Sequence, residues 1–356
     1  MRRIAALLLA AIVCAALCPL AGATSPGQTS PAAPGPAESA VPEGTGAPET
    51  PENAPFTIDL SIVGDCLLAT YRGQYYAGSF SDYAASQPSS YFFEKVRHIF
   101  SADDFTLVNL ENVLTDRPLA ERDKGEGTAY WFKAPAANAR ILTDGGVEAV
   151  SLANNHTGDY GPQGLADTAA AVEAAGLPFG TNEQTVYLEK NGFIIAVICH
   201  GLWNEGQASQ IVRRIEEASA QSDYQIVLYH GGAEGVHQPE DWRVRASRRL
   251  ADAGADLVLG SHPHVLQPEE VYNGVPIVYS LGNFCYGGNR SPENRTVIYK
   301  VLLTVEEGRV VSQATDMVPC YVYTGSTNNW QPAPITDEAE RQRVLDFMGG
   351  TADSPF

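Results

Sequence analysis

Seven short apolar runs divide the chain after residue 55, and stretches with helical periodicity lie between several of them. The runs span residues 56–65, 105–111, 147–156, 192–200, 224–230, 255–264 and 276–284. The helical stretches span residues 135–143, 163–175, 207–220 and 241–253. Strands that alternate with helices predict an α/β fold with a largely parallel and buried sheet. Two β-rich runs on either side of Glu307 and Gly308 predict an antiparallel hairpin near the end of the chain.

The first 55 residues differ from the rest of the chain. Arg2 and Arg3 precede an apolar stretch, and residues 21–23 (AGA) match a small-x-small cleavage signal, so residues 1–23 are predicted to be a secretory signal peptide. The apolar stretch runs almost unbroken to that signal, which leaves an uncleaved membrane anchor as the alternative. Residues 24–55 are mostly Pro, Ala, Gly, Ser, Thr and Glu and predict a disordered linker. We therefore expect an exported protein, outside the cell or at its surface.

Composition narrows the class of protein. With 356 residues and 44% hydrophobic residues, the chain can bury a large core, and we expect one domain at 56–335 and a C-terminal tail at 336–356. The net charge of −19 argues against nucleic-acid binding, which requires a basic surface. The sequence holds no G-x-S-x-G elbow, P-loop or dinucleotide fingerprint. No spacing predicts a disulfide, and Cys66, Cys199 and Cys285 lie in apolar contexts that favour buried thiols.

Five of the apolar runs end in side chains that can bind a metal ion. These side chains are Asp65, Glu111, the triplet Asn154-Asn155-His156, His230, and His262 with His264. In an open α/β sheet, ligands bind outside the carboxyl ends of the strands, where the loops converge. Oxygen and imidazole ligands without thiolates suit Zn²⁺, Mn²⁺ or Fe. Each residue alone has an ordinary structural explanation, but the set predicts a metal site at the strand ends.

His262 and His264 are separated by one proline. In extended backbone, side chains two residues apart point to the same side of the strand. We therefore expect both imidazole rings to face the same site.

Two other stretches bear on the surroundings of such a site. Trp131 and Phe132 precede a predicted helix, where they either line the pocket or belong to the core. The stretch 241–253 carries four arginines, for which we expect a solvated helix face, with contact to an anionic polymer as the alternative.

Six segments together resemble the CapA-type bacterial capsule synthesis proteins, also called poly-γ-glutamate biosynthesis proteins. The segments are IVGD, NLENVLT, SLANNHTGDYGPQGLADT, HGGAEG, ADAGADLVLGSHPHVLQPEEVYNG and VYSLGNF, and the resemblance covers roughly residues 56–287. ANNHTGDYG and GSHPHVLQP together are specific. This family looks related to the calcineurin-like metallophosphoesterases. The resemblance therefore implies a four-layer αββα sandwich with two divalent metal ions at the strand ends.

The resemblance also implies a role for each matching residue. Asp65 and His264 would bind the first ion, and Glu111 would bridge the two ions. Asn155, His230 and His262 would bind the second ion. His156 would stand just outside the ions as the acid or the transition-state donor. The remaining residues of these segments, expected to support the ligands or to face the substrate, are Asn154, Asp159, Glu234 and Asn283.

The sequence departs from the metallophosphoesterase pattern at two positions. Leu67 stands where the calcineurin type usually carries a histidine, two residues after the first aspartate. The bridging position is Glu111 rather than an aspartate. The first ion therefore has fewer ligands, which puts a permanently occupied pair in doubt.

These expectations lead to one main hypothesis and two alternatives. The main hypothesis is an exported metal-dependent hydrolase that acts on a phosphoester or a γ-glutamyl bond of a capsule or wall polymer, alongside other membrane components of capsule synthesis. The first alternative is a non-catalytic accessory protein for polymer assembly or export. The second is a structural domain stabilised by metal. His156 favours the hydrolase, whereas Leu67 favours the alternatives.

Overall fold

Two β-sheets form the centre of the structure, a computed structural model that describes residues 54–125, 129–288 and 293–356. All of these residues belong to one compact unit, Thr50–Phe356. The predicted signal peptide and almost all of the predicted linker lie outside the described residues. In the part that is described, no helix is both long enough and apolar enough to cross a membrane.

The first sheet has seven strands in the order β16-β15-β14-β1-β3-β6-β7. Their bounds are β1 Phe56–Cys66, β3 Phe105–Leu110, β6 Ala149–Ser151, β7 Phe179–Gly180, β14 Arg295–Glu306, β15 Arg309–Tyr321 and β16 Ala333–Pro334. Strands β1, β3, β6 and β7 are parallel, and β14 to β16 add an antiparallel edge. Strands β14 and β15 are the hairpin predicted from the sequence. Glu307 and Gly308 at its turn both have positive φ, as a two-residue hairpin turn of type I′ requires.

The second sheet has six strands in the order β12-β13-β11-β10-β9-β8. Their bounds are β8 Val186–Lys190, β9 Phe193–Gly201, β10 Tyr224–His230, β11 Leu257–Ser261, β12 Leu266–Tyr272 and β13 Val275–Leu281. The four central strands are parallel, and both edge strands are antiparallel. A third, small sheet comprises β2 Thr70–Tyr71, β4 Val113–Leu114 and β5 Phe132–Ala134.

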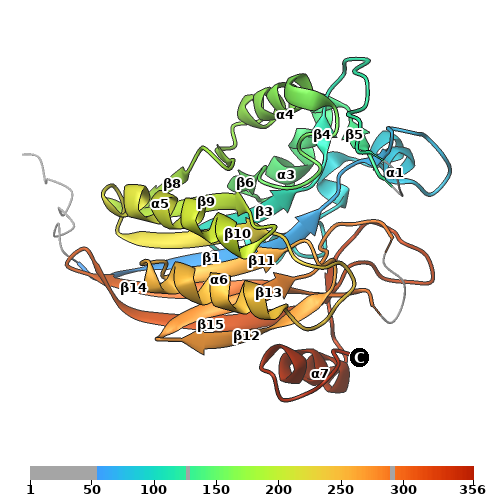
Figure 1. The fold of residues 1–356 in the computed structure, drawn as a ribbon. Coiled ribbons are helices and arrows are strands. Elements are labelled where there is room, and N and C mark those ends of the chain that lie inside the picture. The colour runs from blue at the N-terminus through green and yellow to red at the C-terminus, as the bar shows by residue number, and fades with distance from the viewer. Residues whose placement is uncertain (1–53, 126–128, 289–292) are drawn as a thin grey trace, which may run out of the picture. The chain divides into compact units, whose positions relative to one another are not determined.

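Alternation along the strands explains how the layers stack. In β10, Tyr224 and Ile226 point into the core between the two sheets, whereas Val227 and Tyr229 point to the outer core. Helices α5 (Ala208–Ser219) and α6 (Asp241–Asp252) cover this outer core. Helices α3 and α4 cover the other sheet, with Leu142 and Val172 in its outer core (Figure 1). The arrangement is a four-layer αββα sandwich, which confirms the predicted fold class.

The four stretches predicted to be helical correspond to helices α3 to α6. The bounds of the described α-helices are α1 Phe80–Ser86, α2 Arg97–Phe100, α3 Ala139–Gly145, α4 Gly161–Ala174, α5 Ala208–Ser219, α6 Asp241–Asp252 and α7 Glu338–Met348. Helix α7 lies in the segment assigned to the C-terminal tail, and Val344, Phe347 and Met348 are buried in the core between the sheets. The four described cysteines are buried free thiols, and burial raises the pKa of Cys66 and Cys199 to about 12.

The two sheets are joined where their parallel strands end. Asp65 at the end of β1 forms a β-bridge with Asn283, just after β13. The Asp65 N–H donates to the Gly282 carbonyl at 3.0 Å, and the Phe284 N–H donates to the Asp65 carbonyl at 2.8 Å. A Cβ atom at Gly64 would lie 1.9 Å from the Gly282 oxygen, so only glycine permits this approach. This junction brings the strand ends of both sheets to one place.

Candidate metal centre

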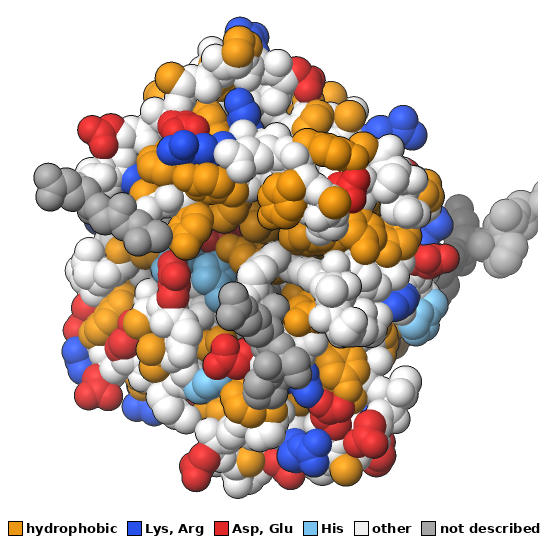
Figure 2. Space-filling model, turned by 90° about the vertical axis from the view of Figure 1, so that its right-hand side faces the viewer, with side chains coloured by type: hydrophobic (Ala, Val, Ile, Leu, Met, Phe, Trp, Pro, Cys, Tyr) orange, Lys and Arg blue, Asp and Glu red, His pale blue; other side chains and the backbone are white. Residues whose placement is uncertain are grey.

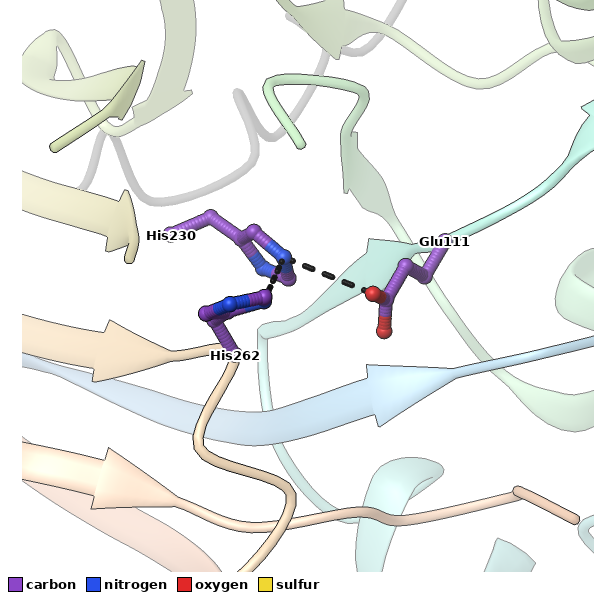
Figure 3. Close-up of side chains that lie close together, drawn as sticks. All are labelled: Glu111, His230 and His262. Atoms are coloured by element: carbon purple, nitrogen blue, oxygen red, sulfur yellow. Dashed lines mark hydrogen bonds and ion pairs between the residues drawn. The ribbon is translucent and has the colours of Figure 1, made fainter. Parts of the chain in front are cut away.

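The strand ends of both sheets contribute polar side chains to one buried cluster. Asp65 lies at the end of β1, and His230 lies at the end of β10. Glu111 directly follows β3, and His262 begins the loop after β11. Figure 3 shows Glu111, His230 and His262 pointing toward one another. All four residues are buried. The prediction that distant strand ends converge therefore agrees with the geometry.

Asp65 is held by donors on both of its carboxylate oxygens. The Asn109 amide donates to Oδ1 at 2.7 Å, and the His262 N–H donates to Oδ2 at 3.1 Å. The imidazoles of His230 and His264 lie 3.5 and 3.4 Å from these oxygens. Burial alone would favour the neutral acid, but the charges and hydrogen bonds of these histidines hold the pKa of Asp65 well below its usual range.

Glu111 is a buried carboxylate without hydrogen-bond donors. Its side chain is fully buried, and neither oxygen accepts a hydrogen bond from any described residue. The histidine nitrogens nearest to Oε1 are the Nε2 atoms of His230 at 3.4 Å, His264 at 3.9 Å and His156 at 4.0 Å. Buried carboxylates normally have partners, so this side chain fits a ligand that faces a cation.

His230 lies between the two carboxylates. Its Nδ1 is 2.9 Å from the Ser261 hydroxyl, and its Nε2 is 2.8 Å from Oδ1 of Asn155. Although burial acts to lower it, the nearby carboxylates of Glu111 and Asp65 raise the pKa of His230 to about 9. In the absence of a metal ion, His230 is therefore a charged partner of both acids.

The backbone around Pro263 differs from the sequence expectation. Strand β11 ends at Ser261, and His262 and His264 both have positive φ, at 99° and 60°. The argument from extended backbone was therefore wrong. The rings nevertheless lie together, with centroids 5.6 Å apart. Burial, together with His230 and His264, lowers the pKa of His262 to about 2.

His264 lies beside the Asp65 carboxylate, with its Nδ1 at 3.4 Å from Oδ2. Its Nδ1 lies 2.8 Å from Oδ1 of Asn283, a residue expected to support the ligands. Burial opposes the charged form, but Glu111 and Asp65 raise the pKa of His264 to about 10. Tyr286 packs on its ring at a centroid distance of 4.9 Å.

The loop after β6 holds the three residues of the predicted triplet in different roles. Asn155 faces His230 at 2.8 Å, as described above. Asn154 points into its own loop, where its Oδ1 accepts hydrogen bonds from the N–H groups of His156 and Thr157. Its amide group donates to Oδ1 of Asn109 at 3.1 Å. Asn154 therefore fixes the conformation of the loop that presents Asn155 and His156.

His156 is oriented by a buried aspartate. Its Nδ1 lies 2.8 Å from Oδ2 of Asp159, which also accepts a hydrogen bond from the Phe132 N–H at 2.7 Å. Lys124 forms an ion pair with the other oxygen of Asp159 at 2.5 Å. This arrangement leaves Nε2 of His156 facing Glu111. The predicted acid is thus at the edge of the cluster with one ring nitrogen directed inward.

Glu234 reaches the cluster from the loop after β10. Its side chain is 64% exposed, and Oε1 lies 3.9 Å from Nε2 of His262. Backbone hydrogen bonds connect this loop to the histidine loop, from the Gly231 N–H to the Ser261 carbonyl and from the Gly235 N–H to the Pro263 carbonyl. These bonds fix the distance between Glu234 and His262.

Three groups of side chains have the spacing of metal ligands. One potential ligand atom from each member lies within 4.8 Å of the others in Asp65-Glu111-His264, in Glu111-His230-His262, and in Glu234-His262-His264. The first two groups share Glu111, as a bridging carboxylate would. Leu67 is buried at the position where a further histidine was missing, and it offers no ligand atom. The cluster is a possible metal site, while the role of each residue stays a prediction.

Sequence reasoning missed several supporting residues. Asn109 lies within β3 and contacts Asp65, His230 and Asn154, but a single amide in an apolar strand gave no signal. Lys124 comes from a loop with no periodic pattern. Arg243 of α6 is fully buried, contrary to the expected solvated face, and its Nη1 donates to the Gly231 carbonyl at 2.6 Å.

Several known proteins match most of the chain. The PGA biosynthesis protein CapA of Bacillus subtilis (strain 168) is 28% identical over 339 residues, which cover 87% of this chain and 83% of that protein. The capsule biosynthesis protein CapA of Bacillus anthracis is 26% identical over 314 residues, covering 81% and 72%. A solved hypothetical protein from Thermus thermophilus has a TM-score of 0.46 and 16% identity, covering 74% of this chain and 99% of that chain. The profile described as "Bacterial capsule synthesis protein PGA_cap" matches residues 59–287, well over half of the sequence, and the chain therefore belongs to this family of bacterial capsule synthesis proteins.

Proposed function

We propose that this protein is an exported, metal-dependent hydrolase of capsule polymer production that cleaves a phosphoester or a γ-glutamyl bond. The observation that carries the proposal is Glu111, a fully buried carboxylate without hydrogen-bond donors that is common to two ligand groups. The relatives named for PGA or capsule biosynthesis support a role in polymer production. The amino-terminal sequence pattern supports export to the cell surface or beyond it.

The side chains present fit two divalent cations. Asp65 and His264 would hold the first with Glu111, and His230, His262 and Asn155 would hold the second with Glu111. The donor set contains oxygen and imidazole nitrogen only, which suits Mn²⁺, Zn²⁺ or Fe. Divalent cations bound there would supply Lewis-acid polarisation of a phosphoryl or carbonyl oxygen and activation of water.

His156 is the residue suited to proton transfer. Asp159 accepts from Nδ1 and fixes the orientation of the ring, so Nε2 is the nitrogen that faces the reacting groups. A proton held at Nε2 can be donated to the leaving oxygen or nitrogen, a contribution that amounts to about 10²- to 10⁴-fold in rate. Lys124 pairs with the other oxygen of Asp159 at 2.5 Å and so holds the aspartate that orients the ring.

A non-catalytic accessory role is the second candidate, favoured by Leu67. In that role the cluster would bind metal and a polymer end without turnover, and His156 would have no proton to transfer. The two candidates differ in one measurable property, the dependence of hydrolysis on His156.

The test is hydrolysis of bis(4-nitrophenyl) phosphate by the Mn²⁺-loaded protein. We expect His156→Ala to lower kcat by about 10²-fold or more while Mn²⁺ binding stays unchanged. His98→Ala serves as the control, because His98 is exposed on helix α2. Hydrolysis that is absent from the wild type would favour the accessory role, and hydrolysis that is equal in the His156→Ala variant would remove the catalytic role proposed for His156.

A further inference from the structure

A cavity lined by aromatic side chains opens directly beside the candidate metal centre. It has a volume of about 350 Å³, within the range of pockets for small organic ligands. Six aromatic side chains line it: Tyr71, Tyr76, Tyr130, Phe132, Tyr286 and Trp330. His156, His264 and Glu234 lie at its metal-facing end. Figure 2 shows hydrophobic side chains gathered along a hollow on this face, with histidine side chains visible at its edge.

The aromatic walls start at the two imidazoles that flank the centre. The Phe132 ring packs edge-on against His156 with centroids 4.7 Å apart, and Tyr130 stacks parallel to Phe132 at 6.1 Å. On the opposite wall, the Tyr286 ring lies 4.9 Å from that of His264. A group attached to the reacting atom would therefore extend from the metal centre directly between aromatic rings.

The charge of the cavity is unsuited to a carboxylate beyond its metal-facing end, where His264 lies. No lysine or arginine is among the described residues that line it, and its carboxylate, Glu234, would repel an anion. The nearby cations are engaged elsewhere. Arg72 pairs with Glu121 at 3.1 Å and lies over the Trp131 ring, and Lys124 pairs with Asp159 at 2.5 Å. Away from the metal-facing end, an anion would lose its hydration without gaining an opposite charge from a described side chain.

Leu67 contributes to the same property. It lines the cavity next to Ala69 and Thr70, at the position where a metallophosphoesterase of the calcineurin type usually carries a histidine ligand. Leu67 therefore gives the cavity an apolar wall and offers no ligand atom to a metal ion.

We infer that the site takes a phosphoester whose attached group is an uncharged, ring-sized apolar moiety, and that it excludes the γ-glutamyl polymer backbone. Every γ-linked glutamate of the polymer carries a free α-carboxylate, and the described lining beyond His264 offers no cation to the carboxylates that would lie along the aromatic walls. Aromatic faces on both walls instead match a flat apolar ring. This inference rests on the proposed function and selects one of its two substrate classes.

The experiment measures binding of three phosphonates that cannot be hydrolysed, by calorimetry with the Mn²⁺-loaded protein. Phenylphosphonate should bind at least about tenfold more tightly than methylphosphonate, because its ring is buried between the aromatic walls. It should also bind at least about tenfold more tightly than 4-carboxyphenylphosphonate, which differs by one carboxylate. Equal affinities, or tighter binding of the carboxylated ligand, would overturn the inference and leave the hydrolase proposal intact.

A substitution at the cavity rim tests the charge argument. Tyr76 lines the cavity and is 55% exposed, so Tyr76→Arg should be tolerated and should narrow the preference for the uncharged ligand by about tenfold. Tyr187→Arg is the matched control, because Tyr187 is 41% exposed on β8 and does not line the cavity. An unchanged preference in Tyr76→Arg contradicts the inference.

Two further outcomes separate the inference from the proposal it rests on. If γ-glutamyl-4-nitroanilide is cleaved in preference to 4-nitrophenyl phenyl phosphate, the hydrolase proposal stands and the inference fails. If none of the phosphonates binds and neither compound is cleaved, the hydrolase proposal itself fails.

Discussion

Replacing Glu111 by glutamine should separate the stability of the metal-free protein from its stabilisation by metal. Glutamine keeps the volume of the side chain and removes its charge. Because neither Glu111 oxygen accepts a hydrogen bond from a described residue, the substitution breaks no hydrogen bond in the described structure. The variant therefore tests the charge of Glu111 rather than its packing.

In the metal-free protein, two contributions to the free energy of unfolding oppose each other. Burial of the Glu111 carboxylate costs several kcal/mol. An imidazolium at 3.4 Å, the distance of His230 Nε2, offsets this by about 5 kcal/mol if the effective dielectric constant is about 20. Since these amounts are similar, we expect the metal-free Glu111→Gln variant to lie within about 1 kcal/mol of the wild type.

Bound metal ions should stabilise the wild type more than the Glu111→Gln variant. A ligand at 100 times its Kd stabilises the folded state by about 2.7 kcal/mol per site. Two sites that share Glu111 would contribute about twice that amount. With about 2 °C per kcal/mol for a domain of this size, the wild-type Tm should rise by roughly 10 °C. The Glu111→Gln variant should gain less than about 2 °C, because both sites lose the shared carboxylate.

The assay is thermal unfolding in EDTA and in excess MnCl₂, followed by circular dichroism. Glu306→Gln is the matched control, since Glu306 is exposed at the end of β14, and it should respond to Mn²⁺ as the wild type does. The reasoning is refuted if Mn²⁺ raises the Tm of Glu111→Gln as much as that of the wild type, or if the wild type does not respond.

Three other variants probe separate parts of the structure. Burial is the main cause that raises the pKa of Glu148 to about 7, and Asp103 adds to it, so the folded state loses stability as the pH rises from about 4.5 to 7. Glu148→Gln should therefore raise the free energy of unfolding at pH 8 by about 1–2 kcal/mol after solvent screening, and it should leave that energy unchanged at pH 4.5. Urea unfolding measures both values, and a gain that is the same at both pH values contradicts the prediction. Asp159→Asn should lower kcat about 10²-fold at unchanged Mn²⁺ affinity in steady-state kinetics and metal titration, because it misorients His156; an unchanged kcat would remove Asp159 from the mechanism. Glu234→Gln should raise the Kd of the more weakly bound Mn²⁺ about tenfold, as judged by calorimetry, without changing the Tm in EDTA; equal affinities would place Glu234 outside the metal site.

Much of the fold could be predicted because local pattern and global architecture agree. The apolar runs became strands, the amphipathic stretches became α3 to α6, and the Glu307-Gly308 turn produced the hairpin of β14 and β15. The candidate ligands could be found because each follows an apolar run, and parallel strands of a sandwich end at a common edge.

The details of the site depended on contacts that no local pattern reports. The positive φ angles of His262 and His264 occur in a loop that meets the junction of the two sheets at Asp65 and Asn283, and this junction joins segments more than 200 residues apart. Buried Arg243 was expected in solvent because its neighbours are charged, and only the fold places it under the loop of Gly231.

The aromatic cavity could not be predicted for a related reason. Its six aromatic side chains come from segments near residues 71–76, 130–132, 286 and 330, and none of these segments is periodic. Phe132 and its neighbour Trp131 had two open interpretations, lining the pocket or belonging to the core. The structure places Phe132 against His156 on the cavity wall.

The most direct test of the central claim is anomalous diffraction from crystals of the protein grown with Mn²⁺. The account predicts two strong peaks, one on each side of the Glu111 carboxylate, with Asp65 and His264 around one and His230 and His262 around the other. Ordered side chains at this cluster with no anomalous peak beside Glu111 would contradict it.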